Sequence, residues 1–107
     1  MSRTGVVIVT YNSAGMIERC LKSCAELPVV VVDNASHDAT CELVRRHTLA
    51  RLIANAGNRG FAGAVNQGVA ALDTELILLL NPDTELKTSI EKLETACLEA
   101  GTGLAAG

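Results

Sequence analysis

Four short, unbroken apolar runs constrain the fold of this chain more than any other feature of its sequence. They cover residues 6–10, 29–32, 52–54 and 76–80. Within these runs apolar residues do not alternate with polar ones, so each run predicts a strand buried on both faces. Stretches of helical periodicity separate the runs. Repeated strand–helix units predict an α/β fold, a parallel sheet with helices on both faces.

The predicted helices follow the spacing of apolar residues between the runs. The first predicted helix places Ile17, Cys20, Leu21 and Cys24 on one face. The second carries Cys41, Val44 and His47, with Ser36 or Asp38 as its cap; the third covers Ala64–Leu72, and the fourth runs from about Thr88 to Ala100. Between the third strand and the third helix lies a glycine-rich segment over residues 55–63. Residues 103–107 resemble the start of a fifth strand.

Length and composition predict a single domain with an aliphatic core. The chain has 107 residues, of which 49% are hydrophobic but only 2% aromatic. The formal net charge of −3 argues against a nucleic-acid partner, which would require clustered lysine and arginine. Neither a membrane-spanning run nor a signal peptide is recognised, which predicts a cytoplasmic chain. The four cysteines have no metal-binding spacing, so they are expected to be buried free thiols, with a zinc site or a disulfide as the less favoured alternative.

Polar side chains follow every predicted strand, at the end where ligands bind to open parallel sheets. The four groups are Thr10, Tyr11 and Asn12; Asp33, Asn34 and Ser36; Asn55, Gly57, Asn58 and Arg59; and Asn81, Asp83 and Thr84. Because the strands are expected to be parallel, all four groups should line one rim. The rim would combine donors, acceptors, one cation and two carboxylates.

Three charged residues of this rim have both a functional and a structural interpretation. Asp33 could accept hydrogen bonds from a ribose or a base edge, or it could cap a nearby helix. Arg59, among glycines, could grip a phosphate, or it could be a solvated loop residue. Asp83 suits Mg²⁺ or Mn²⁺ beside a diphosphate, or it could be a turn acid.

Several other nucleotide-binding classes fit the sequence poorly. Gly57, Gly60 and Gly63 have GxxGxxG spacing after the third strand, whereas nicotinamide and flavin enzymes have GxGxxG after the first. A receiver domain would need acidic residues after the first strand, and a nucleotidylyltransferase would need a glycine-rich basic loop there. Residues 10–12 provide neither. A catalytic triad involving His37 or His47 is not indicated.

Four segments together resemble family 2 glycosyltransferases. They are Val6–Asn12, Val31–Ser36 with Asp38–Thr40, Asn55–Gly68, and Leu78–Asp83. The third is similar to the segment of rhamnosyltransferase-like members. The resemblance covers nearly the whole chain in the right order.

The resemblance implies the GT-A fold, a Rossmann-like parallel sheet that binds a nucleoside diphosphate sugar. It also implies inverting transfer of the sugar from that donor, such as dTDP-rhamnose or a UDP-sugar. Carried over by position, the nucleotide-binding residues would be Thr10, Tyr11, Asn12, Asp33, Asn34, Asn58, Arg59 and Asn81. Asp83 would hold a divalent Mg²⁺ or Mn²⁺ ion. The family pattern is Asp-X-Asp, whereas this chain has Asn81-Pro82-Asp83, a form found in rhamnosyltransferase-like members.

The resemblance also implies what these 107 residues lack. The general base of the family lies well downstream of the metal motif, so no catalytic residue is assigned. The chain is expected to be a nucleotide-sugar-binding domain that ends before the acceptor-binding half and does not turn over alone. The full-length protein would act on a glycan or lipid-linked acceptor in cell-wall or polysaccharide biosynthesis, in the cytoplasm or peripherally at the inner face of the membrane. The alternative is a nucleotide-binding module without catalytic activity.

Overall fold

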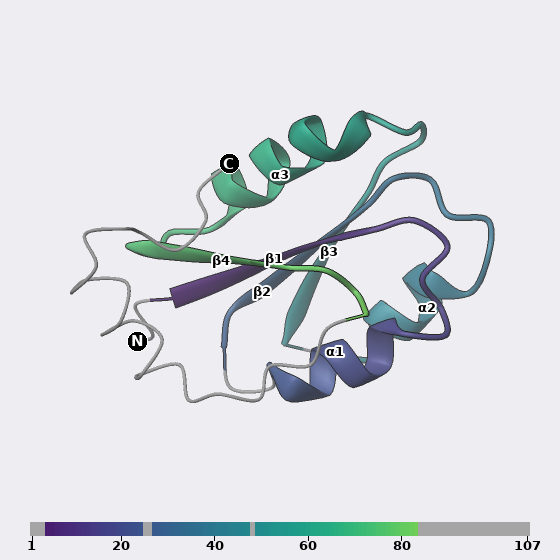
Figure 1. Ribbon diagram of the computed structural model, residues 1–107, viewed down its shortest axis with the longest axis horizontal. Helices are drawn as coiled ribbons and strands as arrows, with labels where there is room; N and C mark the ends of the chain where they lie inside the picture. The colour runs from purple at the N-terminus through teal and green to yellow at the C-terminus, as the bar shows by residue number, and fades with distance from the viewer. Residues whose placement is uncertain (1–3, 25–26, 48, 84–107) are drawn as a thin grey trace.

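The computed structural model describes residues 4–24, 27–47 and 49–83, and a sheet of four parallel strands forms its centre (Figure 1). The strands are β1 (Thr4–Thr10), β2 (Val29–Asp33), β3 (Ala50–Ala54) and β4 (Leu76–Leu80). They lie in the order β3-β2-β1-β4, so the chain returns across β1 before it adds β4. The strand order therefore reverses between β1 and β4, which is where open α/β sheets bind ligands. The predicted parallel α/β sheet is confirmed.

Helices cover both faces of the sheet, as predicted. α1 (Ile17–Ser23) and α2 (Thr40–Arg45) lie on one face, and α3 (Gly60–Ala71) lies on the other (Figure 1). The core is accordingly divided into two clusters, one on each side of the sheet. The helix predicted near residues 88–100 and the strand start at 103–107 lie outside the described residues.

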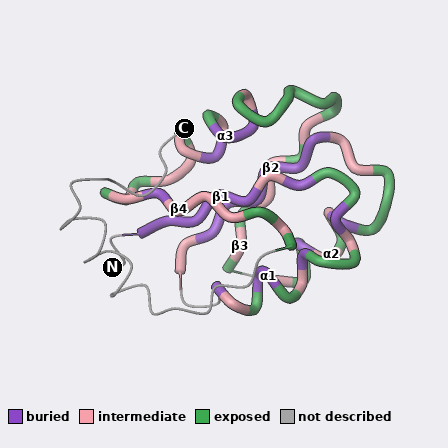
Figure 2. Tube along the Cα trace, viewed as in Figure 1, coloured by how far each residue is buried: buried purple, intermediate pink, exposed green. Residues whose placement is uncertain are grey.

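The valine run of β2 shows why an unbroken apolar sequence suits a central strand. Val29 and Val31 pack into the cluster beneath α1 and α2, whereas Val30 and Val32 pack with Ala64 of α3. All four valines are buried, as Figure 2 shows for β2 and for most of β1. Because successive side chains of a strand point to opposite faces, a strand covered on both sides needs apolar residues at every position.

A close approach between α3 and β1 explains the glycine within the third helix. A Cβ atom on Gly68 would lie 2.5 Å from Cγ1 of Val7. Glycine in a helix interior is about 1 kcal/mol less favourable than alanine, so from the sequence alone Gly68 is expected to destabilise the helix. In the structure the missing side chain lets the helix backbone rest directly on the sheet.

Three elements begin earlier than the sequence predicts. β1 starts at Thr4, two residues before the predicted Val6. β3 starts at Ala50, two residues before the predicted Leu52, because Arg51 lies on an edge strand where a charged side chain reaches solvent. α3 starts at Gly60, four residues before the predicted Ala64. Gly60 has a φ of 75°, which a glycine adopts readily.

The described cysteines are free, as predicted. Cys20 and Cys24 are buried in α1 and at its end, and Cys41 is partly buried in α2; Cys97 lies outside the described residues. A hydrogen bond with Cys20 lowers the pKa of the Cys24 thiol to about 7, and the same contact raises the pKa of Cys20. Across the described ranges, every helix is too short or too polar to cross a bilayer.

Candidate functional site

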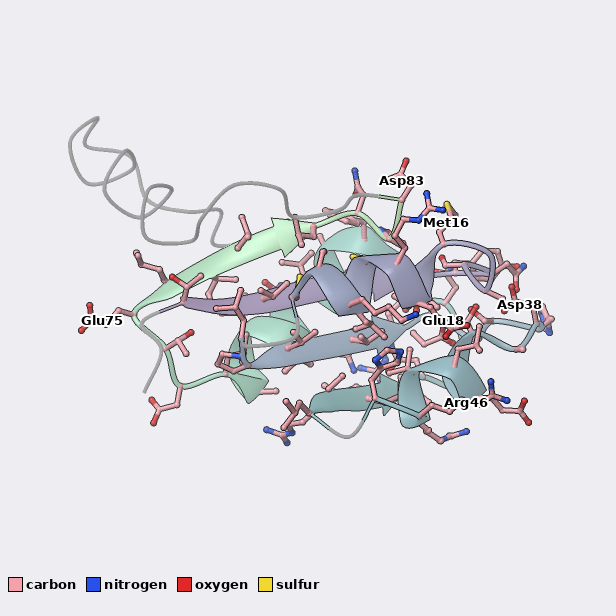
Figure 3. The ribbon with its side chains drawn as sticks, turned by 90° about the horizontal axis from the view of Figure 1, so that it is seen from below. Met16, Glu18, Asp38, Arg46, Glu75 and Asp83 are labelled. Carbon is pink, nitrogen blue, oxygen red and sulfur yellow. The ribbon has the colours of Figure 1, made fainter. Side chains whose placement is uncertain are left out.

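The carboxyl ends of all four strands meet at one end of the sheet. Thr10 of β1 is in register with Asp33 of β2, which is in register with Ala54 of β3. β4 ends at Leu80, opposite Ile8 of β1. Figure 3 shows Asp38 and Asp83 toward this end and Glu75 at the other. The predicted residues that follow the strands therefore gather along one rim, apart from Thr84, which lies outside the described residues.

Asp33 lies beneath this rim and is bonded to the protein. Its side chain is only 1% exposed. Oδ1 accepts hydrogen bonds from the Thr10 hydroxyl at 2.7 Å and the Ser36 hydroxyl at 2.6 Å, and Oδ2 accepts one from the Ser36 amide at 2.9 Å. Burial opposes ionisation, but these hydrogen bonds from Ser36 and Thr10 outweigh it and lower the pKa of Asp33. Asp33 thus ties the end of β1 to the turn after β2, and its contact with a ligand stays a prediction.

The turn after β1 is held by side chains of the turn after β2. Three consecutive backbone amides, those of Asn12, Ser13 and Ala14, donate to the Ser36 hydroxyl at 2.7 Å, the Thr40 hydroxyl at 2.9 Å and the Asp38 carboxylate at 3.1 Å, respectively. In return, the Asn12 side-chain oxygen accepts from the His37 amide at 2.8 Å. A phosphate could reach these three amides only by displacing their partners. This arrangement agrees with the absence of a dinucleotide fingerprint at the first turn.

Asp38 is the centre of that contact, although its side chain is exposed. It accepts hydrogen bonds from the amide and the hydroxyl of Thr40 as well as from Ala14. The bond from the Thr40 hydroxyl is the main reason that the pKa of Asp38 is lowered. The sequence offered Asp38 as a helix cap and as part of the family segment Asp38–Thr40, but the N-cap of α2 is Ala39, with no side-chain cap bond. The spacing of Asp38 to Thr40 was the available signal, because Asp side chains commonly bond to backbone two residues away.

A second buried group of contacts joins the turn after β2 to the glycine-rich segment. The side chain of Asn34, 3% exposed, accepts from Asn55 Nδ2 at 3.1 Å and from the Arg59 amide at 3.2 Å, and it donates to the Gly60 carbonyl at 3.1 Å. Asn55 is bonded in turn to Gln67 of α3. Asn34 thus lies under the rim and holds the start of α3.

Three other predicted residues present their side chains to solvent at the rim. Tyr11 is 51% exposed, and Asn58 and Arg59 are also exposed. The Asn58 oxygen accepts from the Gly60 amide at 2.7 Å, which shapes the loop. Within the part of the chain that the structure describes, the Arg59 guanidinium makes no hydrogen bond or ion pair. An aromatic ring and a cation are therefore available to a ligand.

The residue predicted to hold a metal, Asp83, lies in the turn after β4. Asn81 and Asp83 are exposed, and the Asn81 carbonyl accepts a hydrogen bond from the Cys20 thiol at 3.7 Å. Over residues 4–83, apart from the gaps, there is no cluster of three or more His, Cys, Asp or Glu side chains that could hold a metal ion. A carboxylate and an amide oxygen are nevertheless hard donors, which suit Mg²⁺ or Mn²⁺ shared with substrate phosphates. The residues fit a metal that needs the ligand to complete its coordination.

Two cavities lie away from the rim. One, of about 300 Å³, is lined by residues that include Leu21, Lys22, Val29, His47 and Ala50. The other, of about 270 Å³, lies beside Val30, Arg51 and Thr74. Both are near the amino ends of the strands, and neither is lined by a predicted site residue.

We expect the stability of the protein to fall at acid pH through Asp33 and Asp38. Because folding lowers the pKa of both carboxyls below the ordinary value of 3.8, their contribution is complete above that value and is lost as the pH falls through the folded pKa values. Asp33→Asn should lower the free energy of unfolding at pH 7 by about 1–3 kcal/mol and flatten its decline in acid, measured by urea denaturation from pH 7 to pH 2. Asp73→Asn, at an exposed carboxyl that makes no hydrogen bond with the described residues, is the control. An unchanged acid slope in Asp33→Asn would contradict this assignment.

Comparison with known proteins gives both a family and a set of similar structures. The sequence model described as Glycosyl transferase family 2 matches residues 5–107. Succinoglycan biosynthesis protein ExoO of Rhizobium meliloti (strain 1021) is 37% identical over 102 aligned residues, covering 84% of this chain and 29% of that protein. S. aureus TarS 1-349 superposes with a TM-score of 0.79 at 25% identity, covering 92% of this chain and 33% of that one.

A third relative was solved with ligands. The mannosyltransferase PcManGT from Pyrobaculum calidifontis, in complex with GDP-Man and Mn²⁺, has a TM-score of 0.72 and is 30% identical. The match covers 80% of this chain and 29% of that structure. The chain thus spans about a third of the length of each of these three proteins. The α/β sheet described above is the one found in these glycosyltransferase structures.

Proposed function

The chain belongs to glycosyltransferase family 2, and on this premise we propose that it forms the donor-binding part of an inverting glycosyltransferase. The full-length protein would transfer a sugar from a nucleoside diphosphate sugar to a glycan or lipid-linked acceptor. The observation that carries the proposal is the rim, where four strand ends gather the exposed Tyr11, Arg59 and Asp83 around the switch point of the sheet.

Each exposed residue of the rim has a role that suits this reaction. The Tyr11 ring would pack against the base of the donor, and Asn12, Asn58 and Asn81 would bond to the nucleoside or the sugar. Thr10, Asp33 and Asn34 would shape the floor of the nucleoside pocket. The Arg59 guanidinium would pair with the diphosphate, whose negative charge grows as the bond to the sugar breaks.

Asp83, with Asn81 beside it, would hold a divalent Mg²⁺ or Mn²⁺ ion. A bound ion would supply charge neutralisation to the diphosphate leaving group. The structure of PcManGT in complex with GDP-Man and Mn²⁺ supports this assignment. In-line displacement at the anomeric carbon also needs a base to take the proton of the acceptor hydroxyl. We assign that base to no described residue and place it, with the acceptor site, in the remainder of a longer protein.

We also propose an identity for the donor and a class for the acceptor. Asn81 in place of the first acid of Asp-X-Asp favours a rhamnosyltransferase-like enzyme with a dTDP-sugar, while a UDP-sugar is the second choice. The similarity to a succinoglycan biosynthesis protein supports a role in polysaccharide biosynthesis. We place the protein in the cytoplasm, with the acceptor reached at the inner face of the membrane.

Calorimetry on the full-length protein tests the proposal. We expect dTDP, UDP or GDP to bind more tightly with Mn²⁺ than without it, and the corresponding nucleotide sugar to be consumed when an acceptor is supplied. Binding of nucleoside diphosphate without turnover would favour the second candidate, a nucleotide-binding module. For such a module, a floor of buried side chains that are already hydrogen-bonded to the protein would be enough to bind the nucleotide. A folded, full-length protein that binds none of the three, with or without metal, would refute both.

A further inference from the structure

Three amide side chains from three different elements form one connected network beneath the rim. Asn34 follows β2, Asn55 follows β3, and Gln67 lies in the second turn of α3. Asn55 and Gln67 face each other and exchange two hydrogen bonds: Asn55 Nδ2 donates to Gln67 Oε1 at 2.8 Å, and Gln67 Nε2 donates to Asn55 Oδ1 at 2.9 Å. Asn55 Nδ2 also donates to Asn34 Oδ1 at 3.1 Å.

These contacts fix which way each amide faces. Asn34 Oδ1 also accepts from the Arg59 backbone amide, and Asn34 Nδ2 donates to the Gly60 carbonyl. If the Asn34 amide were reversed, its NH₂ group would face two other donors, and its oxygen would face a carbonyl. The same argument applies to Asn55, which must present its NH₂ to two oxygens. The three amides therefore have one mutually consistent orientation, in which Gln67 holds Asn55 against Asn34.

The far end of this network holds the backbone on both sides of the Arg59 side chain. The Arg59 amide and the Gly60 carbonyl are its two backbone partners, at 3.2 Å and 3.1 Å from Asn34. Gly60 has a φ of 75°, so the chain turns sharply there into α3. The guanidinium itself meets no partner among the described residues. The backbone from which the Arg59 side chain projects is thus held in place by the protein itself, without a ligand.

We infer that Gln67 is a positioning residue that aims Arg59 at the rim through Asn55 and Asn34. The inference rests on the proposed function, in which Arg59 pairs with the donor diphosphate. The benefit to binding would be pre-organisation: because the backbone at Arg59 is already held in place, less conformational freedom is lost when the anion binds. Gln67 needs no contact with the ligand, because the hydrogen-bonded chain of amides carries its effect.

A double-mutant cycle on the full-length protein tests this inference. Calorimetry with Mn²⁺ would compare a nucleoside diphosphate with the matching nucleoside in the wild type, Gln67→Ala, Arg59→Ala and the double variant. We expect Gln67→Ala to lower the affinity for the nucleoside diphosphate by about tenfold and to leave the affinity for the nucleoside nearly unchanged. In the Arg59→Ala background, the same substitution should have little further effect, because the cation that it positions is gone.

Gln67→Met separates the amide from its packing, since methionine keeps much of the length and volume of glutamine without hydrogen-bonding groups. Persistence of the weak diphosphate binding in Gln67→Met supports the inference. Recovery of wild-type affinity in Gln67→Met, equal losses for nucleoside and diphosphate, or additive effects of Gln67→Ala and Arg59→Ala would each overturn it. A wild-type protein that binds no nucleoside diphosphate would instead refute the proposed function.

Discussion

Replacing Asp83 with alanine is expected to lower the metal-dependent affinity of the full-length protein for nucleoside diphosphates by about 100-fold. Asp83 is the one carboxylate of the Asn81-Pro82-Asp83 turn, so its removal leaves only an amide oxygen from that turn for a divalent ion. Without Mn²⁺, the wild type and Asp83→Ala should both bind the nucleotide weakly, so most of the difference in affinity between them should disappear. Calorimetry with and without Mn²⁺ measures the two quantities directly.

Asp73→Ala is the matched control for that experiment. Asp73 is also an exposed carboxylate flanking β4, but it precedes the strand and lies at the opposite end of the sheet from the rim. Its replacement makes the same change in net charge and should leave binding at the wild-type level. If Asp83→Ala kept its full Mn²⁺-dependent affinity, Asp83 would not be the metal ligand, and the assignment would have to be abandoned.

Gly68→Ala is expected to destabilise the fold by about 2 kcal/mol. The new Cβ would lie 2.5 Å from Cγ1 and 3.0 Å from Cγ2 of Val7, in the middle of the contact between α3 and β1. Valine has few rotamers available, so relief requires the helix to move away from the sheet. The gain in helix propensity, about 1 kcal/mol, offsets only part of this steric cost. Urea denaturation followed by circular dichroism measures the difference.

Gly63→Ala provides the comparison within the same helix. A Cβ there meets only the Arg59 Cβ at 3.4 Å, an ordinary contact, so this variant should be neutral or slightly stabilised. In a Val7→Ala background, where the opposing methyl groups are absent, Gly68→Ala should lose most of its cost. Equal effects of the two glycine substitutions would show that the approach of α3 to β1 is not what requires Gly68.

The central part of the fold was predictable because burial leaves a plain signature. The four valines before Asp33 leave neither face of that strand suited to solvent, so they predict a strand that is buried on both sides. The spacing of Ile17, Cys20 and Leu21 matches the buried side of α1. Parallel order then follows from the alternation of strands and helices. The rim was predictable for the same reason, since each apolar run ends in polar residues.

The starts of β3 and α3 were not predictable from local patterns. Arg51 interrupts the apolar run of β3, and only its place on the sheet edge makes it compatible with a strand. α3 begins within a glycine-rich segment because Asn34, which lies 26 residues earlier, holds Gly60. Contacts of this range have no counterpart in the periodicity of the sequence.

The same limit applies to the candidate site. Position at a strand end singled out Asp33 and Asn34, and both do lie at that end of the sheet. The sequence could not show that each is buried beneath the rim and bonded to protein groups. Gln67 carried no signal, since a glutamine on a helix is usually solvated. Whether the predicted residues contact nucleotide stays a prediction, and the experiments above address it.

The hydrogen bonds that join the turns after β1 and β2 have a consequence for how this site can diverge. Asn12, Ser13 and Ala14 depend on Ser36, Asp38 and Thr40 for the partners of their amides. An insertion or deletion in either turn would leave amides of the other unpaired, and therefore would need a compensating change there. Among related sequences, the lengths of these two turns should accordingly vary together, and their residues should covary as spatial neighbours do. We therefore expect the two turns to change together in evolution, as one structural unit.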